Sequence, residues 1–510
     1  MGVKLGFMFW LALIVVIFVV VAILDLRQTK HAIRRNFPVL GWLRYALEML
    51  GPELRQYIIS ANNAERPFTR DQRSWVYASA KKQNNYFGFG TDNDLELSPN
   101  YLIIKHSVFP LPESHDPNYS LPCAKVLGAY HNRPKAFRPS SVVNVSGMSF
   151  GSLSAPAIEA LNRGVKIAGA LQSTGEGGIS RYHKSGGDLI WQIGTGYFGC
   201  RNPDGTFSLE KFLESAQNAP VKAIEIKLSQ GAKPGLGGVL PAHKVSAEIA
   251  EARGVPIGED CISPSHHSAF NSVDGLIDFL ELLSSQTGLP VGIKSAVGDL
   301  EFWQLLAQRM LARKEGPDFI TIDGGEGGTG AAPLAFTDHV SLPFKMGFSR
   351  VYGEFAKLGM QQQIVFIGSG KLGFPEDALF AFGLGCDMIN VAREAMLAIG
   401  CIQAQKCHTN HCPTGVATQD KWLIRGLDPT DKSARLANYL ITLRKEILRL
   451  CHACGQPHPA FISSKHFEIL NDQFGSQTLE TLFAYQPDWG MPSCTDQSVA
   501  RELMKSQIVN

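Results

Sequence analysis

The chain has 510 residues, of which 45% are hydrophobic and 18% charged, so it can bury a large core and is not a disordered protein. A formal net charge of +2 gives no electrostatic reason to expect nucleic-acid binding, and ten cysteines in a chain of this length are not a disulfide scaffold. The length suggests two or three domains of about 150 residues each, or one large α/β barrel with additions.

An unbroken apolar run from Leu5 to Leu24 has roughly the 20 residues that a helix needs to cross a bilayer. A cleaved signal peptide is the alternative, but no cleavage site of small residues follows the run, and we expect a permanent anchor. Four basic residues come after the run: Arg27, Lys30, Arg34 and Arg35. By the positive-inside rule, the sequence predicts a single-pass membrane protein whose catalytic body lies on the cytoplasmic side.

Four segments follow from the composition along the chain. Residues 1–30 are the predicted transmembrane anchor, and residues 31–140 combine a juxtamembrane helix with a proline-containing connector that wraps a domain. Residues 141–425 are the predicted main domain. Residues 426–510 are a predicted C-terminal helical extension, whose end carries no motif that indicates a function.

Short β-branched runs alternate with helical stretches from residue 141 onwards, which indicates βαβ units and a parallel sheet. The eight runs are Val142–Gly147, Gly169–Thr174, Leu189–Gly194, Ala223–Ser229, Pro290–Ser295, Phe319–Gly324, Ile364–Ser369 and Asp387–Ala392. Eight such units predict an α/β fold of the (β/α)8 TIM-barrel type. The long gap between the fourth and fifth runs predicts an elaborated loop over the C-terminal mouth of the barrel.

Glycine-rich segments follow several of these runs, in loops that meet at the mouth of a barrel. They are GGEGGTGAAP at 324–333 and GSGKLG at 368–373, and Arg393 comes directly after the eighth run. Glycine lets backbone N–H groups approach a phosphate closely, so we interpret these loops as a cofactor-phosphate site. The alternative is that the glycines only form strand-to-helix turns. Lys294, at the end of the fifth run, could stabilise the negative charge of a reduced flavin.

Three cysteines lie within twelve residues, at Cys401, Cys407 and Cys412, and a proline follows the last. This pattern is typical of thiolates that wrap an iron–sulfur cluster. Three ligands indicate a [3Fe–4S] cluster, or a cluster with a fourth ligand elsewhere. A zinc site is the competing interpretation, because His408 and His411 lie between the cysteines, but the spacing does not match the usual pairs of zinc ligands.

Six motifs in the same order resemble the FMN-binding glutamate synthase family, the stand-alone relatives of the synthase domain of the glutamate synthase large subunit. They are SGMSFGSLSAPA (146–157), STGEGG (173–178), IKLSQGAKPGLGG (226–238), ISPSHH (262–267), DGGEGGTGAAP (323–333) and CIQAQKCHTNHCPTGVATQD (401–420). The resemblance implies a barrel that binds FMN and a cysteine motif that holds a [3Fe–4S] cluster. Both agree with the expectations from strand count and cysteine spacing.

The resemblance also implies an activity and roles for single residues. Glutamate synthases condense ammonia with 2-oxoglutarate and reduce the product to glutamate by hydride from FMN, with electrons relayed through the cluster. Matching positions imply that Lys233 and Glu176 contact the substrate. Cofactor-binding positions implied in the same way are Ser149, Ser173, Lys227, Gln230, Lys294, Gly328, Gly330, Gly368, Gly370 and Arg393. The implied cluster ligands are Cys401, Cys407 and Cys412.

The sequence departs from the family pattern in ways that concern the substrate and the partners. It begins with Met1 and the anchor instead of a glutaminase domain, and no glycine-rich dinucleotide fold flanks the barrel. We therefore expect a separate electron donor, such as a ferredoxin or a reductase subunit, and free ammonia or a separate glutaminase subunit. Val239 stands where the family has a glutamine that contacts 2-oxoglutarate, and Ile179 stands where an acidic residue is common.

Two alternatives to glutamate synthesis follow from these departures. One is an oxidoreductase with the same cofactors that acts on another keto acid, an imine or a quinone, since valine removes a polar substrate contact. The other is a non-enzymatic, cluster-bearing subunit. The presence of Lys294, Lys233 and Glu176 argues against the second alternative, because a decayed site loses such groups first.

Overall fold

The computed structural model describes residues 2–28, 32–59, 64–114 and 116–505. The chain divides into two compact units, residues 1–71 and 72–510. The limits of the four predicted segments stay predictions. Lys30, one of the basic residues after the apolar run, and residues 506–510 of the C-terminal extension lie outside the described residues.

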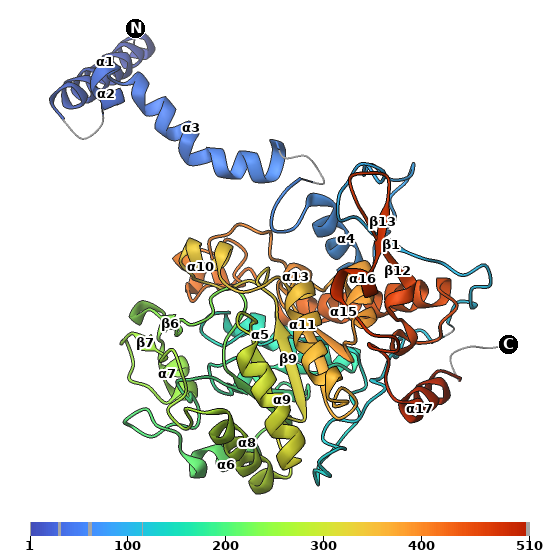
Figure 1. The fold of residues 1–510 in the computed structure, drawn as a ribbon. Helices are drawn as coiled ribbons and strands as arrows, with labels where there is room; N and C mark the ends of the chain where they lie inside the picture. Colours follow the sequence, from blue (N-terminus) through green and yellow to red (C-terminus); the bar gives the residue numbers. More distant parts are fainter. Residues whose placement is uncertain (1, 29–31, 60–63, 115, 506–510) are drawn as a thin grey trace. The chain divides into compact units, whose positions relative to one another are not determined.

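The first unit is helical (Figure 1). Its helices are α1 (Gly2–Arg27), α2 (Ala32–Asn36) and α3 (Leu40–Leu54), and a π-helical turn follows at Arg55–Ile59. Within the described parts of the chain, one helical segment, Met8–Arg27 of α1, is long and apolar enough to cross a membrane, with a mean hydropathy of 3.0. A signal sequence would share these properties, so the membrane anchor stays a prediction.

The second unit is built on a closed barrel of eight parallel strands, as predicted. The strands are β2 (Val143–Val145), β3 (Gln172–Ser173), β4 (Leu189–Ile193), β5 (Val221–Lys227), β8 (Val291–Ser295), β9 (Phe319–Asp323), β10 (Val365–Ser369) and β11 (Met388–Val391). They close in the order β10-β11-β2-β3-β4-β5-β8-β9. Seven of the eight predicted runs contain one strand each, and the run Ala223–Ser229 overlaps β5, which begins two residues earlier, so the TIM-barrel prediction is confirmed.

Helices cover the outside of this barrel (Figure 1). The main ones are α5 (Ala155–Ala168), α6 (Leu209–Gln217), α8 (Val273–Thr287), α9 (Glu301–Arg313), α11 (Phe344–Lys357), α12 (Pro375–Gly383) and α15 (Pro429–Ala453). α5 shows why they form where they do: the Ser154 side chain caps its first turn, and Gly169 ends it at φ 65°. Between β3 and β4 there is only a 3-10 turn, Arg181–Lys184. α15 packs against both α5 and α12, so it completes the helical ring.

The segment between β5 and β8 is the elaborated loop that the sequence predicts. It contains β6 (Val239–Leu240) and β7 (Cys261–Ile262), which pair antiparallel, with the 3-10 turn Ala242–Lys244 and α7 (Ala247–Arg253) between them. Because this insertion starts at the carboxyl end of β5, it lies at the end of the barrel where active sites of this fold form.

Part of the predicted wrapping connector closes the opposite, N-terminal end of the barrel. Cys123 and Leu127 are fully buried and belong to one apolar cluster with residues from the starts of the strands, such as Ala223 and Phe319. We call residues 121–141 the plug. Its backbone folds back on itself through a bridge between Leu127 and Phe137.

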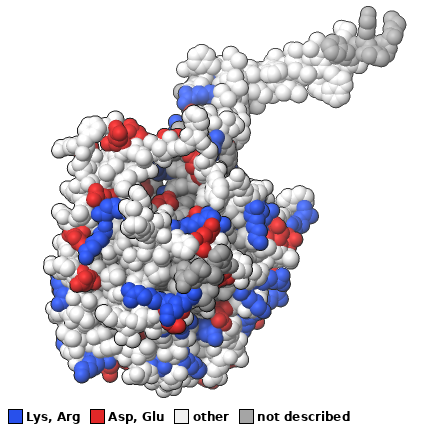
Figure 2. Space-filling model, turned by 90° about the vertical axis from the view of Figure 1, so that its right-hand side faces the viewer, with Lys and Arg blue, Asp and Glu red and all other residues white. Residues whose placement is uncertain are grey.

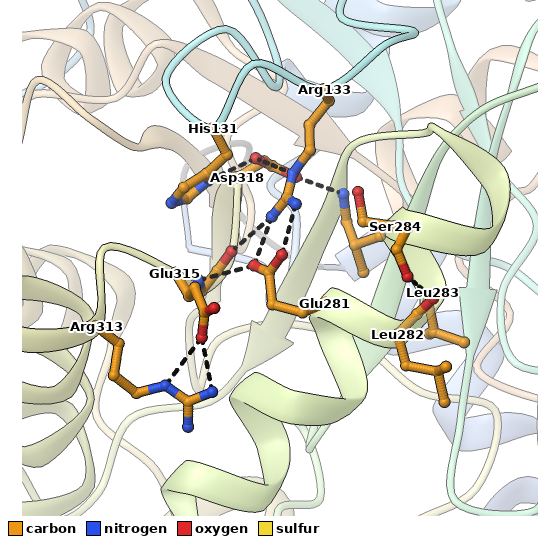
Figure 3. A network of polar contacts seen from close by, with 12 residues as sticks. His131, Arg133, Glu281, Leu282, Leu283, Ser284, Arg313, Glu315 and Asp318 are labelled. Atoms are coloured by element: carbon orange, nitrogen blue, oxygen red, sulfur yellow. Dashed lines mark hydrogen bonds and ion pairs between the residues drawn. The ribbon is translucent and has the colours of Figure 1, made fainter.

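Buried ion pairs fix the plug to the barrel. Lys125 donates to the Asp387 carboxylate at 3.0 Å, just before β11. Arg133 donates to both carboxylate oxygens of Glu281 on α8, at 2.6 and 2.7 Å, and its Nε donates to Asp318, just before β9, at 3.1 Å (Figure 3). These contacts join residues far apart in the chain.

Residues after α15 return to the same side as the connector. β1 (Leu102–Ile104), β12 (Phe467–Leu470) and β13 (Ser476–Thr478) form a small antiparallel sheet, and α16 (Leu479–Phe483) and α17 (Cys494–Lys505) follow. His458 ties this region to the plug: its Nδ1 accepts the N–H of Ala460 at 3.0 Å, and its Nε2 donates to the carbonyl of Pro122 at 2.9 Å. The contact at Nδ1 needs the neutral ring, because a protonated Nδ1 cannot accept a hydrogen bond.

Candidate functional site

A cavity of about 360 Å³ lies at the carboxyl ends of the barrel strands. Most of the predicted site residues line it: Ser149, Glu176, Lys227, Gln230, Lys233, Lys294, Gly328, Gly330, Gly370, Arg393 and Cys407. Ser173, Gly368, Cys401 and Cys412 are not part of the lining. On the face drawn in Figure 2, basic and acidic side chains are interspersed and form no extended patch of one sign.

Lys227 and Glu176 form the centre of the charged wall. Lys227 is the last residue of β5, and its Nζ lies 3.1 Å from Glu176 Oε1 and donates to Gln230 Oε1 at 2.7 Å. Burial raises the pKa of Glu176, but the charges of Lys227, Arg253 and Lys233 outweigh this effect and hold the pKa below its usual value of 4.5. Glu176 is therefore an ionised hydrogen-bond acceptor at neutral pH.

Lys233 stands in the loop after β5 and is half-buried. Its Nζ donates to the backbone carbonyl of Gly237 at 3.3 Å. Burial lowers the pKa of Lys233, the nearby Lys227 lowers it further, and Glu176 acts in the opposite direction. Because its bond goes to a neutral carbonyl, the ammonium of Lys233 can meet the carboxylate of a small acid.

Lys294 is the strand neighbour of Lys227, since the register of β5 and β8 pairs these two residues. Its side chain is buried, with Nζ 3.5 Å from Asp323 Oδ1 and 3.4 Å from Ser146 Oγ. The other oxygen of Asp323 accepts the N–H of Gly231 at 2.9 Å. The ends of β2, β5, β8 and β9 thus bring a fixed cation and its counter-ion to the floor of the cavity.

The glycine loops after β9 and β10 leave room that side chains would fill. A methyl group added to Gly328 would lie 2.5 Å from Arg393 Cδ, so only glycine lets this arginine cross the loop. Gly370 adopts φ +131° beside the backbone of Gly324, whereas nothing lies within 4 Å of a methyl group added to Gly330. Arg393 itself donates to the carbonyl of Glu326. A cationic guanidinium beside a loop without side chains fits a phosphate group.

Of the four predicted residues outside the lining, Ser173 and Gly368 belong to barrel strands and differ in character. Ser173 ends β3, and its buried hydroxyl has no hydrogen-bond partner among the described residues. Gly368 lies within β10, where an added methyl group would meet Leu372, Phe344 and Cys386. Packing of the barrel wall explains this glycine without any cofactor.

A buried polar group below the cavity was missed in the sequence analysis. Glu225, inside β5, accepts from Gln192 Nε2 at 2.5 Å and from Thr321 Oγ1 at 2.7 Å. Gln192 lines the cavity, and because its N–H is used by Glu225, its carbonyl oxygen remains as an acceptor. A glutamate between Ile224 and Ile226, within a buried stretch of β5, is the signal that could have found this group.

The cysteine loop follows the short helix α13 (Arg393–Ala398). Cys401 and Cys407 are half-buried and Cys412 is buried, while Cys407 and His408 line the cavity. Burial, together with the thiolate forms of Cys407 and Cys412, raises the pKa of Cys401 to about 12, so the three thiols act on one another.

The fit of this loop to a metal centre depends on the size of the centre. In the described parts of the chain, no group of three His, Cys, Asp or Glu side chains is arranged to hold a single metal ion. A three-iron cluster spaces its thiolates more widely than one ion does. Positive φ angles at Gln403, Gln405 and Asn410, between 56° and 67°, coil the loop around the cysteines. Three thiols are a donor set that suits an iron–sulfur cluster, and the [3Fe–4S] cluster stays a prediction.

The comparisons with known proteins agree with this site. Residues 122–457 match the family model described as the conserved region in glutamate synthase. The chain is 38% identical over 491 residues to the glutamate synthase large subunit-like protein YerD of Bacillus subtilis. The matched region covers 89% of this chain and 93% of that protein. It is 35% identical over 316 residues to the archaeal glutamate synthase (NADPH) of Methanocaldococcus jannaschii, and spans 59% of that protein.

Solved structures give only distant likenesses. An active chimera of (S)-mandelate dehydrogenase matches with a TM-score of 0.47 and 13% identity, over 78% of this chain and 99% of that one. A mandelate oxidase variant with an FMN adduct matches with a TM-score of 0.40 and 13% identity, over 84% of this chain and 99% of that one.

Proposed function

The chain belongs to the family that shares the conserved region of glutamate synthase and is an oxidoreductase of that type, and from this premise we propose that it aminates a 2-oxo acid reductively with FMN and a [3Fe–4S] cluster. The observation that carries the proposal is the single cavity shared by the cations Lys233, Lys294 and Arg393, the carboxylate Glu176 and the cysteine residue Cys407. Anion-binding, acid–base and electron-relay groups then serve one reaction.

FMN would be held at two ends of the cavity. Arg393 and the loops at Gly328 and Gly370 would bind its phosphate, and Lys294 with Lys227 would face its ring as fixed positive charges. When bound, FMN supplies a hydride, and the cluster held by the three cysteines supplies electrons one at a time. The buried position of Lys294 and Asp323 keeps this part of the site rigid and poor in water.

Substrate binding would depend on Lys233 and Glu176. The ammonium of Lys233 would bind the carboxylate of the 2-oxo acid, and the ionised Glu176 would accept a hydrogen bond from ammonia or from the nitrogen of the imine. Burial lowers the pKa of Lys233, which also makes this group a better proton donor to the developing amine. Both Lys233 and Glu176 line the same cavity.

We propose 2-oxoglutarate as the substrate, with another keto acid, an imine or a quinone as the second candidate. Val239 favours the second candidate, because this half-exposed apolar side chain lines the cavity where a polar contact would suit a second carboxylate. The proposal also includes a separate electron donor, such as a ferredoxin or a reductase subunit, ammonia that is free or comes from a glutaminase subunit, and a membrane anchor in α1 with the body on the cytoplasmic side.

A half-reaction tests the proposal. The detergent-solubilised protein is reduced with dithionite under anaerobic conditions, 2-oxoglutarate and ammonium are added, and flavin absorbance and glutamate are measured. Rapid reoxidation with glutamate formed is the expected result, and Val239→Gln should increase its rate. Reduced flavin that other keto acids reoxidise, but not 2-oxoglutarate, would establish the second candidate. A protein without flavin would contradict both.

A further inference from the structure

Lys244 is a buried cation on the insertion that covers the cavity. It ends the 3-10 turn between β6 and α7, and only 6% of its surface is exposed. Its Nζ donates to the backbone carbonyl of Cys407 at 3.2 Å, and Lys244 lines the cavity together with Cys407. It therefore joins the insertion after β5 to the cysteine loop.

No carboxylate of the described residues forms an ion pair with Lys244, whose Nζ contacts the cysteine loop at the carbonyl of Cys407. Lys125, the comparable buried lysine of the plug, has a carboxylate at 3.0 Å. A buried ammonium without a negative partner is costly, because burial favours its neutral form. Some anion has to compensate Lys244.

The two neighbouring thiols supply that charge only in a metal-bound state. A thiol that binds no metal keeps its proton and carries no charge, so it compensates nothing. Metal coordination removes the proton of a thiol, and the resulting thiolates of a cluster carry the negative charge that Lys244 lacks. The burial of Lys244 and its lack of a carboxylate partner thus both point to a metal-bound, negatively charged cysteine loop.

We propose that Lys244 is the charge partner of the iron–sulfur cluster and raises its reduction potential, in addition to tying the substrate-side insertion to the cluster loop. This inference rests on the proposed function. One-electron reduction adds one negative charge to the cluster, and a fixed ammonium stabilises that state. No bond to Lys244 forms or breaks; the electron comes from the one-electron donor protein, or from dithionite in the test.

The test is a potentiometric titration of the solubilised full-length protein, followed by the EPR signal of the cluster. In Lys244→Met, the ratio of reduced to oxidised cluster at a fixed potential should fall about tenfold, which is a decrease of about 59 mV for one electron. Lys244→Arg keeps the charge and should stay close to the wild type. Lys222→Met is the matched control, because Lys222 is exposed at the opposite end of β5 and should leave the potential unchanged.

Each remaining outcome decides the question. A Lys244→Met variant with the wild-type potential would overturn the inference. Loss of the cluster in both Lys244→Met and Lys244→Arg would also overturn it, because the cluster would then depend on the shape of the lysine side chain and not on its charge. Loss of the cluster in Lys244→Met alone would support it. In metal-free protein, Lys244→Met should unfold at the same or a higher temperature than the wild type; a lower midpoint would reveal another partner and refute the idea. Wild-type protein with FMN but no iron would remove the cluster and this inference, and leave the flavin part of the proposed function standing.

Discussion

Replacing Arg133 by methionine should destabilise the barrel far more than the same change at Arg313. Arg133 is the central cation of the network in Figure 3. Its side chain is 9% exposed, and the side chain of its partner Asp318 is fully buried. The substitution keeps the volume but leaves the Asp318 carboxylate with only His131 and the N–H of Val291 as partners. Removing one partner of such a pair costs about 3–5 kcal/mol.

Arg313 is the matched control, and it lies in the same view (Figure 3). It also makes ion pairs, with Asp278 and Glu315, but these carboxylates are 67% and 45% exposed. Solvent screens such pairs, and we expect a loss below about 1 kcal/mol for Arg313→Met. The assay is unfolding of the solubilised protein, followed by tryptophan fluorescence in urea and in a thermal ramp.

A second readout reports on the plug itself. Cys123 is fully buried in the plug, so its alkylation, followed by peptide mass analysis, should accelerate in Arg133→Met and stay slow in Arg313→Met. Equal shifts of the unfolding midpoint in the two variants, with equal protection of Cys123, would show that the ion pairs do not hold the plug and would refute the reasoning.

Three further predictions concern pH, the phosphate loop and the cluster. Burial lowers the pKa of His458 from 6.5 to about 4, so its contribution to stability is complete above pH 6.5 and is lost as the pH falls towards 4. This loss of unfolding free energy is on the order of 3 kcal/mol in total. The unfolding midpoint should therefore fall less between pH 6.5 and 4 in His458→Gln than in the wild type. Gly328→Ala should displace Arg393 and reduce FMN content several-fold, and Gly330→Ala, where the methyl group meets nothing, should reduce it less; equal losses in a flavin assay would contradict the assigned roles. Cys407→Ser should remove the iron–sulfur absorbance and EPR signal, and an unaltered spectrum would exclude this ligand.

The sequence predicts the barrel well because each of its strands is a local pattern. A run such as Phe319–Gly324 is apolar, ends in glycine and precedes a helical stretch, and all three properties can be read within a few residues. The same is true of the glycine loops and the cysteine spacing, which concern neighbouring positions. Most of the predicted site residues line one cavity, but positions such as Lys233 and Glu176 were implied by the family resemblance and not by a local pattern.

Features made by distant residues could not be predicted in this way. The proline-containing connector indicates an extended chain, but nothing local shows that Cys123 enters the barrel or that Lys125 meets Asp387, 262 positions later. The sequence predicts helix in the C-terminal extension, and only the packing of α15 against α5 shows that this helix completes the helical layer around the barrel. Lys244 looks like one more surface lysine until the fold places it beside Cys407.

Cofactor content is the measurement that tests the central claim most directly. The solubilised full-length protein, purified anaerobically, is analysed for acid-released flavin by chromatography and mass, and for iron and acid-labile sulfide, with an EPR spectrum before and after dithionite. The account predicts one FMN per chain and iron to sulfide close to 3:4, since it assigns a [3Fe–4S] cluster to Cys401, Cys407 and Cys412. Protein that folds but contains neither flavin nor iron, also after reconstitution with both, would contradict it.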